Sequence, residues 1–371
     1  MSGASGTGAA GAANVPFVRI VKRDAAGTKY AVMVRAAALA GALVTGAVLI
    51  LLMGHNPLSV YGVMLTGSLG GALARRETVR IAVPLLVTGM GTALAFKMRF
   101  WNIGGEGQII TGAMAASWFA LYSGIPGPFL LIVMLAASIL AGGLWGLIPA
   151  FFKARWNTNE TLFTLMLNYI ALEMVRFVQY GPWKDPMQRG FPKIAMFVDE
   201  ARLPRVLGIH IGWVVALVLA LAVYIYMKKT KQGYEIAVVG ESIPTARYAG
   251  MKVGRVFLRT MFLSGALCGL TGYLTVAGSN YTLSESVAGG AGFTAITVAW
   301  LSRLNPLVMI LVSVFIAMLQ RGANAVQTAF KIPSAAADIL TGLILFFMLG
   351  CEFFLNYRLV FRGGKEGARR G

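Results

Sequence analysis

Long apolar stretches, separated by short polar ones, run through almost the whole chain. Several reach about 18 residues without a charged side chain, the length that spans the hydrocarbon core of a bilayer. The pattern predicts an all-α polytopic membrane protein with about ten transmembrane helices. We expect them at 36–53, 79–96, 107–122, 129–152, 160–180, 209–227, 256–278, 293–304, 306–319 and 335–354.

Composition supports the membrane assignment. Of the 371 residues, 57 % are hydrophobic and 13 % are charged, whereas soluble domains carry about 25 % charged residues. The net charge of +19 would suit a nucleic-acid partner, but no compact basic domain with interleaved aromatic residues is present. Lys and Arg instead gather in cytoplasmic loops of membrane proteins. The predicted spans place 21 of the 33 Lys and Arg on one side, which puts both termini in the cytoplasm.

Three regions follow from this pattern. Residues 1–35 form an N-terminal tail, which is rich in Gly, Ala and Ser up to about residue 15 and basic after that. It lacks the order of a signal peptide, because no basic segment leads directly into an apolar core. Residues 36–357 form the transmembrane domain, and 358–371 form a basic cytoplasmic tail. The interval 55–80 predicts an interfacial or partly inserted helix on the outer face, with a short extra span as the alternative.

A polar, glycine-rich stretch, 100–108, interrupts the apolar pattern. Its acidic residue, Glu106, would cost about 2.5–3.5 kcal/mol in the middle of a membrane. The neighbouring glycines permit backbone that departs from a helix, and irregular backbone at membrane depth survives only beside protein or a wet cavity. We therefore predict a broken helix at a solute path. An ordinary cytoplasmic turn is the alternative, favoured by Lys97 and Arg99 just before it.

Polar residues also form a pattern in the predicted span 160–180. Glu160, Thr164 and Asn168 are four residues apart and therefore share one helix face. Such a stripe lines a cavity or makes hydrogen bonds between helices. Glu173 and Arg176 are three apart and can form an ion pair. The predicted span 293–304 is short and follows a glycine-rich segment, a pattern typical of transport sites.

The basic inner loop, 228–255, contains a predicted helix. Ser242 is a suitable N-cap, Pro244 fits the first turn, and Gly250 fits the end. The surface around Ala246 and Tyr248 is too apolar for a plain linker. We predict a docking helix for a cytoplasmic partner, with a solvated or lipid-facing loop as the alternative.

Several catalytic classes are excluded. No GxxxxGK[ST] phosphate-binding loop occurs, so the chain does not hydrolyse ATP by that route. The two histidines, His55 and His210, are far apart, and Cys268 and Cys351 lie in apolar runs. They offer no metal site, so we predict none and expect no cofactor in this chain.

Five short segments together resemble a known family. They are 56–58 (NPL), 100–108 (FWNIGGEGQ), 159–160 with 165–169 (NE and LMLNY), 246–250 (ARYAG), and 292–296 with 303–306 (GFTAI and RLNP). In this order they resemble the permease subunits of ATP-binding-cassette (ABC) importers for nucleosides, within the branched-chain amino acid and ribose permease group. Gly105 replaces the usual alanine, and Phe100-Trp101 is bulkier than the common Leu-Phe, which bears on the size of the solute.

The resemblance implies a type II-like importer fold in a bacterial inner membrane. It implies cytoplasmic subunits that bind ATP and Mg²⁺, an extracytoplasmic substrate-binding protein, and a second permease. Because the chain resembles the longer of two paralogues, we expect a heterodimer. It also implies that Glu241, Ala246, Arg247, Tyr248 and Gly250 couple the permease to the ATPase. As a hypothesis for the mechanism, we expect the translocation path to be lined by Asn102, Glu106, Gln108, Asn159, Glu160, Asn168 and Phe293.

Other functions stay open at this point. A secondary transporter or channel would need an ion route, for which Glu106, Glu160, Glu173 and Asp338 are available. A membrane-embedded enzyme would need a convergent set of catalytic groups, and none is apparent. Purine or pyrimidine nucleosides, riboflavin-like compounds and sugars all remain candidates for the solute.

Overall fold

The computed structural model describes residues 18–22, 27–187 and 190–361. The Gly/Ala/Ser-rich start of the predicted tail and residues 362–371 lie outside them. The structure is 78 % helical, as predicted for an all-α membrane protein. It divides into two compact units, 1–49 with 342–371 and 50–341, which are described separately.

The first unit joins the two ends of the chain. Helices α1 (Thr28–Leu52) and α13 (Ser334–Asn356) contribute most of their length to it. An ion pair of 3.0 Å links Arg35 of α1 to Glu352 of α13. Beyond the helices, strand β1 (Val18–Lys22) pairs antiparallel with β4 (Tyr357–Phe361). The sequence pattern did not predict this ladder, because its two strands are more than 330 residues apart.

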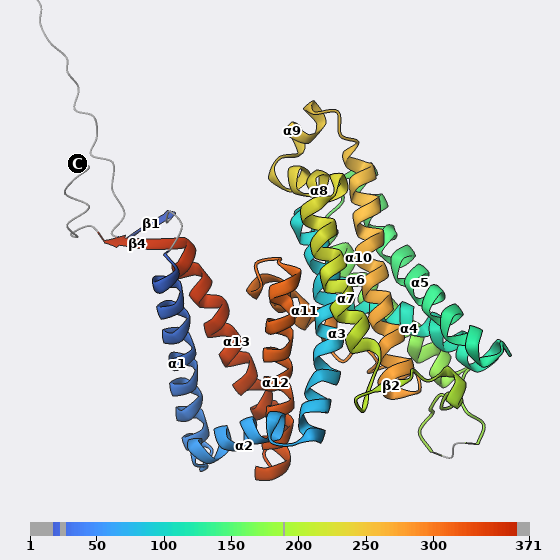
Figure 1. Cartoon of the computed structure of the whole chain (residues 1–371), viewed down its shortest axis with the longest axis horizontal. Helices are drawn as coiled ribbons and strands as arrows, with labels where there is room; N and C mark the ends of the chain where they lie inside the picture. The colour runs from blue at the N-terminus through green and yellow to red at the C-terminus, as the bar shows by residue number, and fades with distance from the viewer. Residues whose placement is uncertain (1–17, 23–26, 188–189, 362–371) are drawn as a thin grey trace, which may run out of the picture. The chain divides into compact units, whose positions relative to one another are not determined.

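The second unit is a helical bundle (Figure 1). Two strands of two residues each, Arg205–Val206 (β2) and Ile209–His210 (β3), form a small hairpin before α7. A 3₁₀ turn covers Asp199–Ala201, and a π-helical turn, Val276–Asn280, extends α10. The helices are α2 (Pro57–Leu69), α3 (Ala72–Lys97), α4 (Gly105–Tyr122), α5 (Gly127–Trp156), α6 (Glu160–Tyr180), α7 (Gly212–Lys229), α8 (Lys231–Glu241), α9 (Ile243–Tyr248), α10 (Val253–Thr275), α11 (Ala291–Leu301) and α12 (Pro306–Phe330).

The number of spans agrees with the prediction of about ten. Within the described residues, eight helices are long and apolar enough to cross a membrane: α1, α3, α5, α6, α7, α10, α12 and α13. The predicted third and eighth spans correspond to α4 and to α11, which has only 11 residues. Helix α2, with 13 residues, is too short to span a bilayer unaided.

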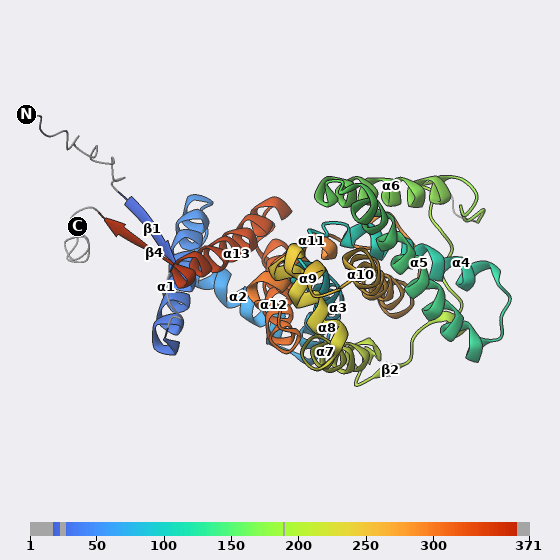
Figure 2. The same ribbon diagram turned by 90° about the horizontal axis from the view of Figure 1, so that it is seen from above.

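Helix α10 is the centre of the second unit. Figure 2 looks along it and shows α3 on one side and α4 and α5 on the other. Small residues let the backbones touch: a Cβ added to Gly269 would lie 2.2 Å from the carbonyl oxygen of Ser138, and one added to Gly142 would lie 2.4 Å from that of Gly265. Gly146 makes a similar contact, because an added Cβ would lie 2.7 Å from the carbonyl oxygen of Met261 in α10. Contacts of this kind hold membrane helices together.

Three predicted boundaries were wrong. Helix α1 begins at residue 28 instead of 36, α3 begins at residue 72 instead of 79, and α12 continues to Phe330, eleven residues beyond the predicted end. The extra turns of α12 are polar on one face, but Gly322 packs against the backbone of Met64 in α2 on the other. The inner loop contains a helix, α8, that was missed. Thr230 caps it, and Ile236 and Val239 bury its inner face.

Candidate solute path and docking helix

The glycine-rich stretch forms a break between two helices. Helix α3 ends at Lys97 and α4 begins at Gly105, so residues 98–104 are not helical. The break is therefore confirmed, but it ends before Glu106, which lies in the first turn of α4. We call residues 98–108 the junction.

The junction lies deep in the bundle. The side chain of Asn102 donates a hydrogen bond of 3.2 Å to the hydroxyl of Ser264 in α10. Ser264 is eleven residues from the start of α10 at Val253, or about 16 Å along the helix axis at 1.5 Å per residue. The apolar segment that contains it has 28 residues. This depth favours a broken helix within the membrane over a turn at the cytoplasmic surface.

The carboxylate of Glu106 binds the start of another helix. Its two oxygens accept hydrogen bonds of 2.8 Å from the backbone N–H groups of Gly290 and Gly292. Both belong to the N-terminus of α11, where unpaired N–H groups and the helix dipole favour an anion. The chains touch here, because a Cβ on Gly292 would lie 2.2 Å from the backbone nitrogen of Glu106. Glu106 thus joins two discontinuous helices.

Asn102 and Gln108 form a buried polar pair, each 1 % exposed. The amide nitrogen of Asn102 donates to the side-chain oxygen of Gln108 at 3.3 Å, and the reverse bond is 3.4 Å. Ser264 donates in turn to the carbonyl oxygen of Gly91 in α3 at 2.7 Å. In this arrangement both amides are satisfied by protein groups. They tie the junction to α3 and α10.

The polar stripe of α6 faces the junction. Asn168 accepts a hydrogen bond of 2.8 Å from the N–H of Gly107 and donates one of 2.9 Å to the carbonyl of Ile103. Thr164 accepts from the N–H of Ile103 at 3.2 Å. The shared face predicted for this stripe is confirmed. The partners of Thr164 and Asn168 are backbone groups of the break and of the first turn of α4.

The remaining two polar path candidates lie at the inner end of α6. Asn159 is exposed and caps the helix by accepting from the N–H of Leu162 at 3.2 Å. Glu160 is buried and forms a 2.9 Å ion pair with Lys153, in the last turn of α5. Eight residues, about 12 Å of helix, separate Glu160 from Asn168. The seven path candidates therefore form two groups at different depths.

Aromatic side chains lie beside the junction. The ring of Phe293, in the first turn of α11, is 46 % exposed, and Trp300 lies two turns further along the same face, 43 % exposed. Trp101 of the junction, 45 % exposed, stacks on Trp300 with ring centroids 5.8 Å apart. We call Trp101, Phe293 and Trp300 the aromatic face. Trp300 was missed, although its spacing of seven from Phe293 predicts a shared face.

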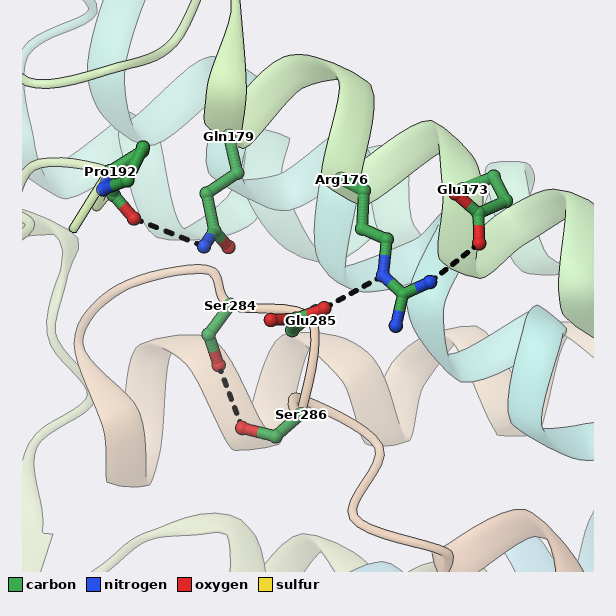
Figure 3. A network of polar contacts seen from close by, with 7 residues as sticks. All are labelled: Glu173, Arg176, Gln179, Pro192, Ser284, Glu285 and Ser286. Atoms are coloured by element: carbon green, nitrogen blue, oxygen red, sulfur yellow. Dashed lines mark hydrogen bonds and ion pairs between the residues drawn. The ribbon is translucent and has the colours of Figure 1, made fainter.

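At its outer end α6 is bound to the loop that leads into α11 (Figure 3). Arg176 forms ion pairs with Glu173 at 2.7 Å and with Glu285 at 2.8 Å. The first of these confirms the pair predicted from their spacing. Gln179 donates to the carbonyl of Pro192 at 3.1 Å, which holds the following loop against the same helix. The segment that leads into α11 is thus held in place by contacts with α4 and with α6.

The predicted docking helix is present as α9. Ser242 caps it by accepting from the N–H of Thr245 at 3.3 Å, and Gly250 follows it with a φ of +77°, which favours glycine. Tyr248 is 96 % exposed, the most of any large apolar side chain described. Arg247 and Glu241 are also exposed. Ala246 was assigned to the docking surface and is instead buried, because it faces the apolar cluster beneath α9.

Among the residues that the structure describes, no group of three His, Cys, Asp or Glu side chains could hold a metal ion.

These features define a multi-pass membrane protein: a bundle of apolar helices, a broken junction deep within it, and an exposed helix on the side rich in Lys and Arg. Residues 74–349 match the family described as "Branched-chain amino acid transport system / permease component", and the chain belongs to this family.

Similar proteins that are named as ABC transporter permeases agree with that assignment. The chain is 35 % identical to the glucose ABC transporter permease protein TsgB13 of Haloferax volcanii, over 86 % of this chain and 87 % of that one. It is 31 % identical to the guanosine ABC transporter permease protein NupP of Bacillus subtilis, over 82 % and 89 %. It is 29 % identical to the nucleoside ABC transporter permease protein NupB of Lactococcus lactis, over 88 % and 93 %.

The chain is thus the permease subunit of an ABC importer, located in the bacterial inner membrane. It has no ATPase site of its own, since that site is carried by a separate subunit. The family implies ATP-binding and substrate-binding partners. This assignment replaces the alternative of a secondary transporter or channel.

Proposed function

We propose that this permease forms half of an ATP-driven import path for nucleosides, in a heterodimer with a paralogous permease. The observation that carries the proposal is the aromatic face beside the junction. Stacking of a base on an aromatic side chain contributes about 1–3 kcal/mol and tolerates different bases. Half-exposed rings next to buried amide groups and the partly buried carboxylate of Glu106 suit a solute with a flat base and a hydroxyl-bearing sugar.

The pattern of relatives supports both parts of the proposal. Two organisms contribute a pair of permeases named for guanosine or nucleosides. This chain is 31 % identical to NupP and 26 % identical to NupQ, both from Bacillus subtilis. It is 29 % identical to NupB and 24 % identical to NupC, both from Lactococcus lactis. Greater similarity to one member of each pair supports a partner that resembles the other member.

In the proposed mechanism the junction is the narrow part of the path. Hydrogen bonds of Asn102, Glu106, Gln108 and Asn168 hold it together in the arrangement described here. When the junction opens, these groups exchange protein partners for the solute. Asn159 and Glu160 then lie at the inner exit, where the Lys153–Glu160 ion pair sits beside the turn from α5 to α6.

The ATP-binding subunit, which would hold ATP and Mg²⁺, docks on α9 in this proposal. Tyr248 and Arg247 form the exposed contact, and Glu241 extends it along α8. Ala246 anchors the helix from below, and Gly250 permits the turn into α10. Docking of a short rigid helix transmits movement between subunits.

Uptake measurements test the solute. The importer, reconstituted in proteoliposomes with its partners, should take up radiolabelled guanosine in an ATP-dependent manner. Phe293→Ala should weaken this uptake about fivefold or more, the equivalent of one stacking contact. The matched control is Phe354→Ala, which removes an exposed ring outside the junction. Equal uptake by the Phe293 variant and the parent would contradict the role of the aromatic face.

A second candidate solute is a sugar, because the relative from Haloferax volcanii is named for glucose. Competition decides between the two. Excess unlabelled guanosine should abolish uptake of labelled guanosine, and glucose should leave it unchanged. ATP-dependent uptake of labelled glucose with no uptake of guanosine would instead establish the sugar.

Replacement of Tyr248 and Arg247 by alanine tests the docking surface. The double variant should separate ATP hydrolysis from uptake, because the exposed contact is lost while the cap at Ser242 stays. Unchanged uptake with this variant would contradict a role of α9 in coupling ATP hydrolysis to transport.

A further inference from the structure

Arg259 is a charged residue inside a segment predicted to span the membrane. It lies in the second turn of α10, and its side chain is 26 % exposed. Its guanidinium forms a 3.0 Å ion pair with Glu235 of α8, which is 19 % exposed. A charge placed in a membrane segment is costly and is usually paired and functional. Here the pair joins the inner helix α8 to the central helix α10.

Around this pair α8 and α9 are firmly attached. Ser242 ends α8 and caps α9, so the two helices share one residue. We call residues 231–248 the docking segment. Its Ile236, Val239 and Ala246 pack in one apolar cluster with Val256 and Phe257 of α10. Movement of the docking segment therefore acts on the inner end of α10.

The other contacts of α10 lead to the junction. Ser264 lies five residues after Arg259, about 8 Å along the helix. It accepts the hydrogen bond from Asn102 and donates to the carbonyl of Gly91. Further along, Gly272 is packed so tightly that an added Cβ would lie 2.2 Å from the carbonyl oxygen of Ile109 in α4. Backbone contacts this close leave little room for α10 to slide independently of α4.

We propose that the Glu235–Arg259 ion pair links the docking segment to α10 and transmits its movement to the junction. Arg259 is a positioning residue in this mechanism. The apolar cluster keeps the docking segment in place, and the ion pair fixes its rotation and height relative to α10. Tyr226 of α7 supports the same site, because its hydroxyl donates to Gln232 of α8 at 3.0 Å. This inference rests on the proposed docking of the ATPase on α9.

The test uses the complete importer in proteoliposomes and a readout that does not depend on the solute. A cysteine is placed at position 293 (Phe293→Cys), and its labelling by a water-soluble maleimide is compared without nucleotide and with ATP and vanadate. The natural thiols, Cys268 and Cys351, are buried and contribute little background. ATP hydrolysis and co-purification of the ATPase subunit are measured in parallel.

In the Phe293→Cys background, Arg259→Met should abolish the nucleotide dependence of labelling, while ATP hydrolysis and co-purification persist. With Phe293 intact, Arg259→Met should lower guanosine uptake. Allosteric couplings are typically 5- to 150-fold, and we expect a loss of uptake in this range. Glu235→Gln, which keeps the shape of the side chain, should act in the same direction. The charge-swapped pair Glu235→Arg with Arg259→Glu should restore part of the coupling.

Glu77→Gln is the matched control, because it breaks a partly exposed ion pair with Arg80 near the start of α3, away from the docking segment. Nucleotide-dependent labelling that persists in both Arg259→Met and Glu235→Gln would overturn the inference, as would a swapped pair that is no better than either single variant. Failure of the docking proposal looks different: labelling would then be independent of nucleotide already in the Phe293→Cys parent, or uptake would survive loss of Tyr248 and Arg247.

Discussion

The glycine contacts of α10 give a prediction whose size can be worked out from the structure. In Gly269→Ala the new Cβ would lie 2.2 Å from the carbonyl oxygen of Ser138 and 3.0 Å from the Cα of Gly142. Ordinary contact begins near 3.4 Å, so α5 must retreat by about 1.2 Å. Both obstacles are backbone atoms, and no side chain can rotate away. Overpacking of this kind costs about 1–3 kcal/mol, and we expect the upper end.

Alanine also gains about 1 kcal/mol over glycine in a helix, so the net destabilisation should be about 2 kcal/mol. Gly62→Ala is the matched control. Gly62 lies in α2 with no atom within 4 Å of an added Cβ, and its replacement should be neutral or stabilising by up to about 1 kcal/mol. The assay is thermal unfolding of the purified importer in detergent. Equal unfolding temperatures for the two variants would refute the backbone packing around α10.

Three further predictions concern single side chains. Asn168→Ala should destabilise the protein by about 2–4 kcal/mol, because the buried N–H of Gly107 and the partly buried carbonyl of Ile103 lose their partner. Asn159→Ala removes only an exposed cap worth about 1 kcal/mol, and similar unfolding temperatures for the two variants would contradict this prediction. Glu106→Gln keeps only one acceptor oxygen, so it should speed hydrogen exchange at the amide of either Gly290 or Gly292. Unchanged exchange at both amides would contradict the capping of α11 by Glu106. Burial, and then the charge of Arg80, lowers the pKa of His210 from 6.5 to about 4. The folded state therefore disfavours the imidazolium, and stability should fall by about 3 kcal/mol as the pH decreases from about 6.5 to 4. His210→Gln should flatten that slope, and an unchanged slope would exclude His210 as its source.

Features that depend on neighbours in sequence were predictable. Apolar runs gave the membrane helices, and a local hydrogen-bonding residue gave the cap at Ser242. The spacing of Glu173 and Arg176 gave their ion pair. The cap and the ion pair depend on contacts within about one helical turn, and the apolar runs are continuous in the chain. A single sequence therefore contains all the information that is needed to predict them.

Features that depend on distant contacts were not predictable. Glu106 was identified as unusual, but its partners at Gly290 and Gly292 lie more than 180 residues away. Helix α8 was taken for part of a basic loop, because its packing against α10 cannot be seen in its charged composition. The last turns of α12 were not predicted for the same reason, because their apolar face packs against α2. Tertiary contacts override local composition at these positions.

One measurement tests the central claim that solute passes the junction under the control of a separate ATPase. Position 293, as Phe293→Cys in the complete importer, is exposed to a water-soluble maleimide in the nucleotide-free state and with ATP and vanadate. We predict that labelling changes between the two states and that guanosine slows it. A thiol that reacts at one rate in both states, or that guanosine never protects, would contradict a water-filled path at Glu106 and the aromatic face.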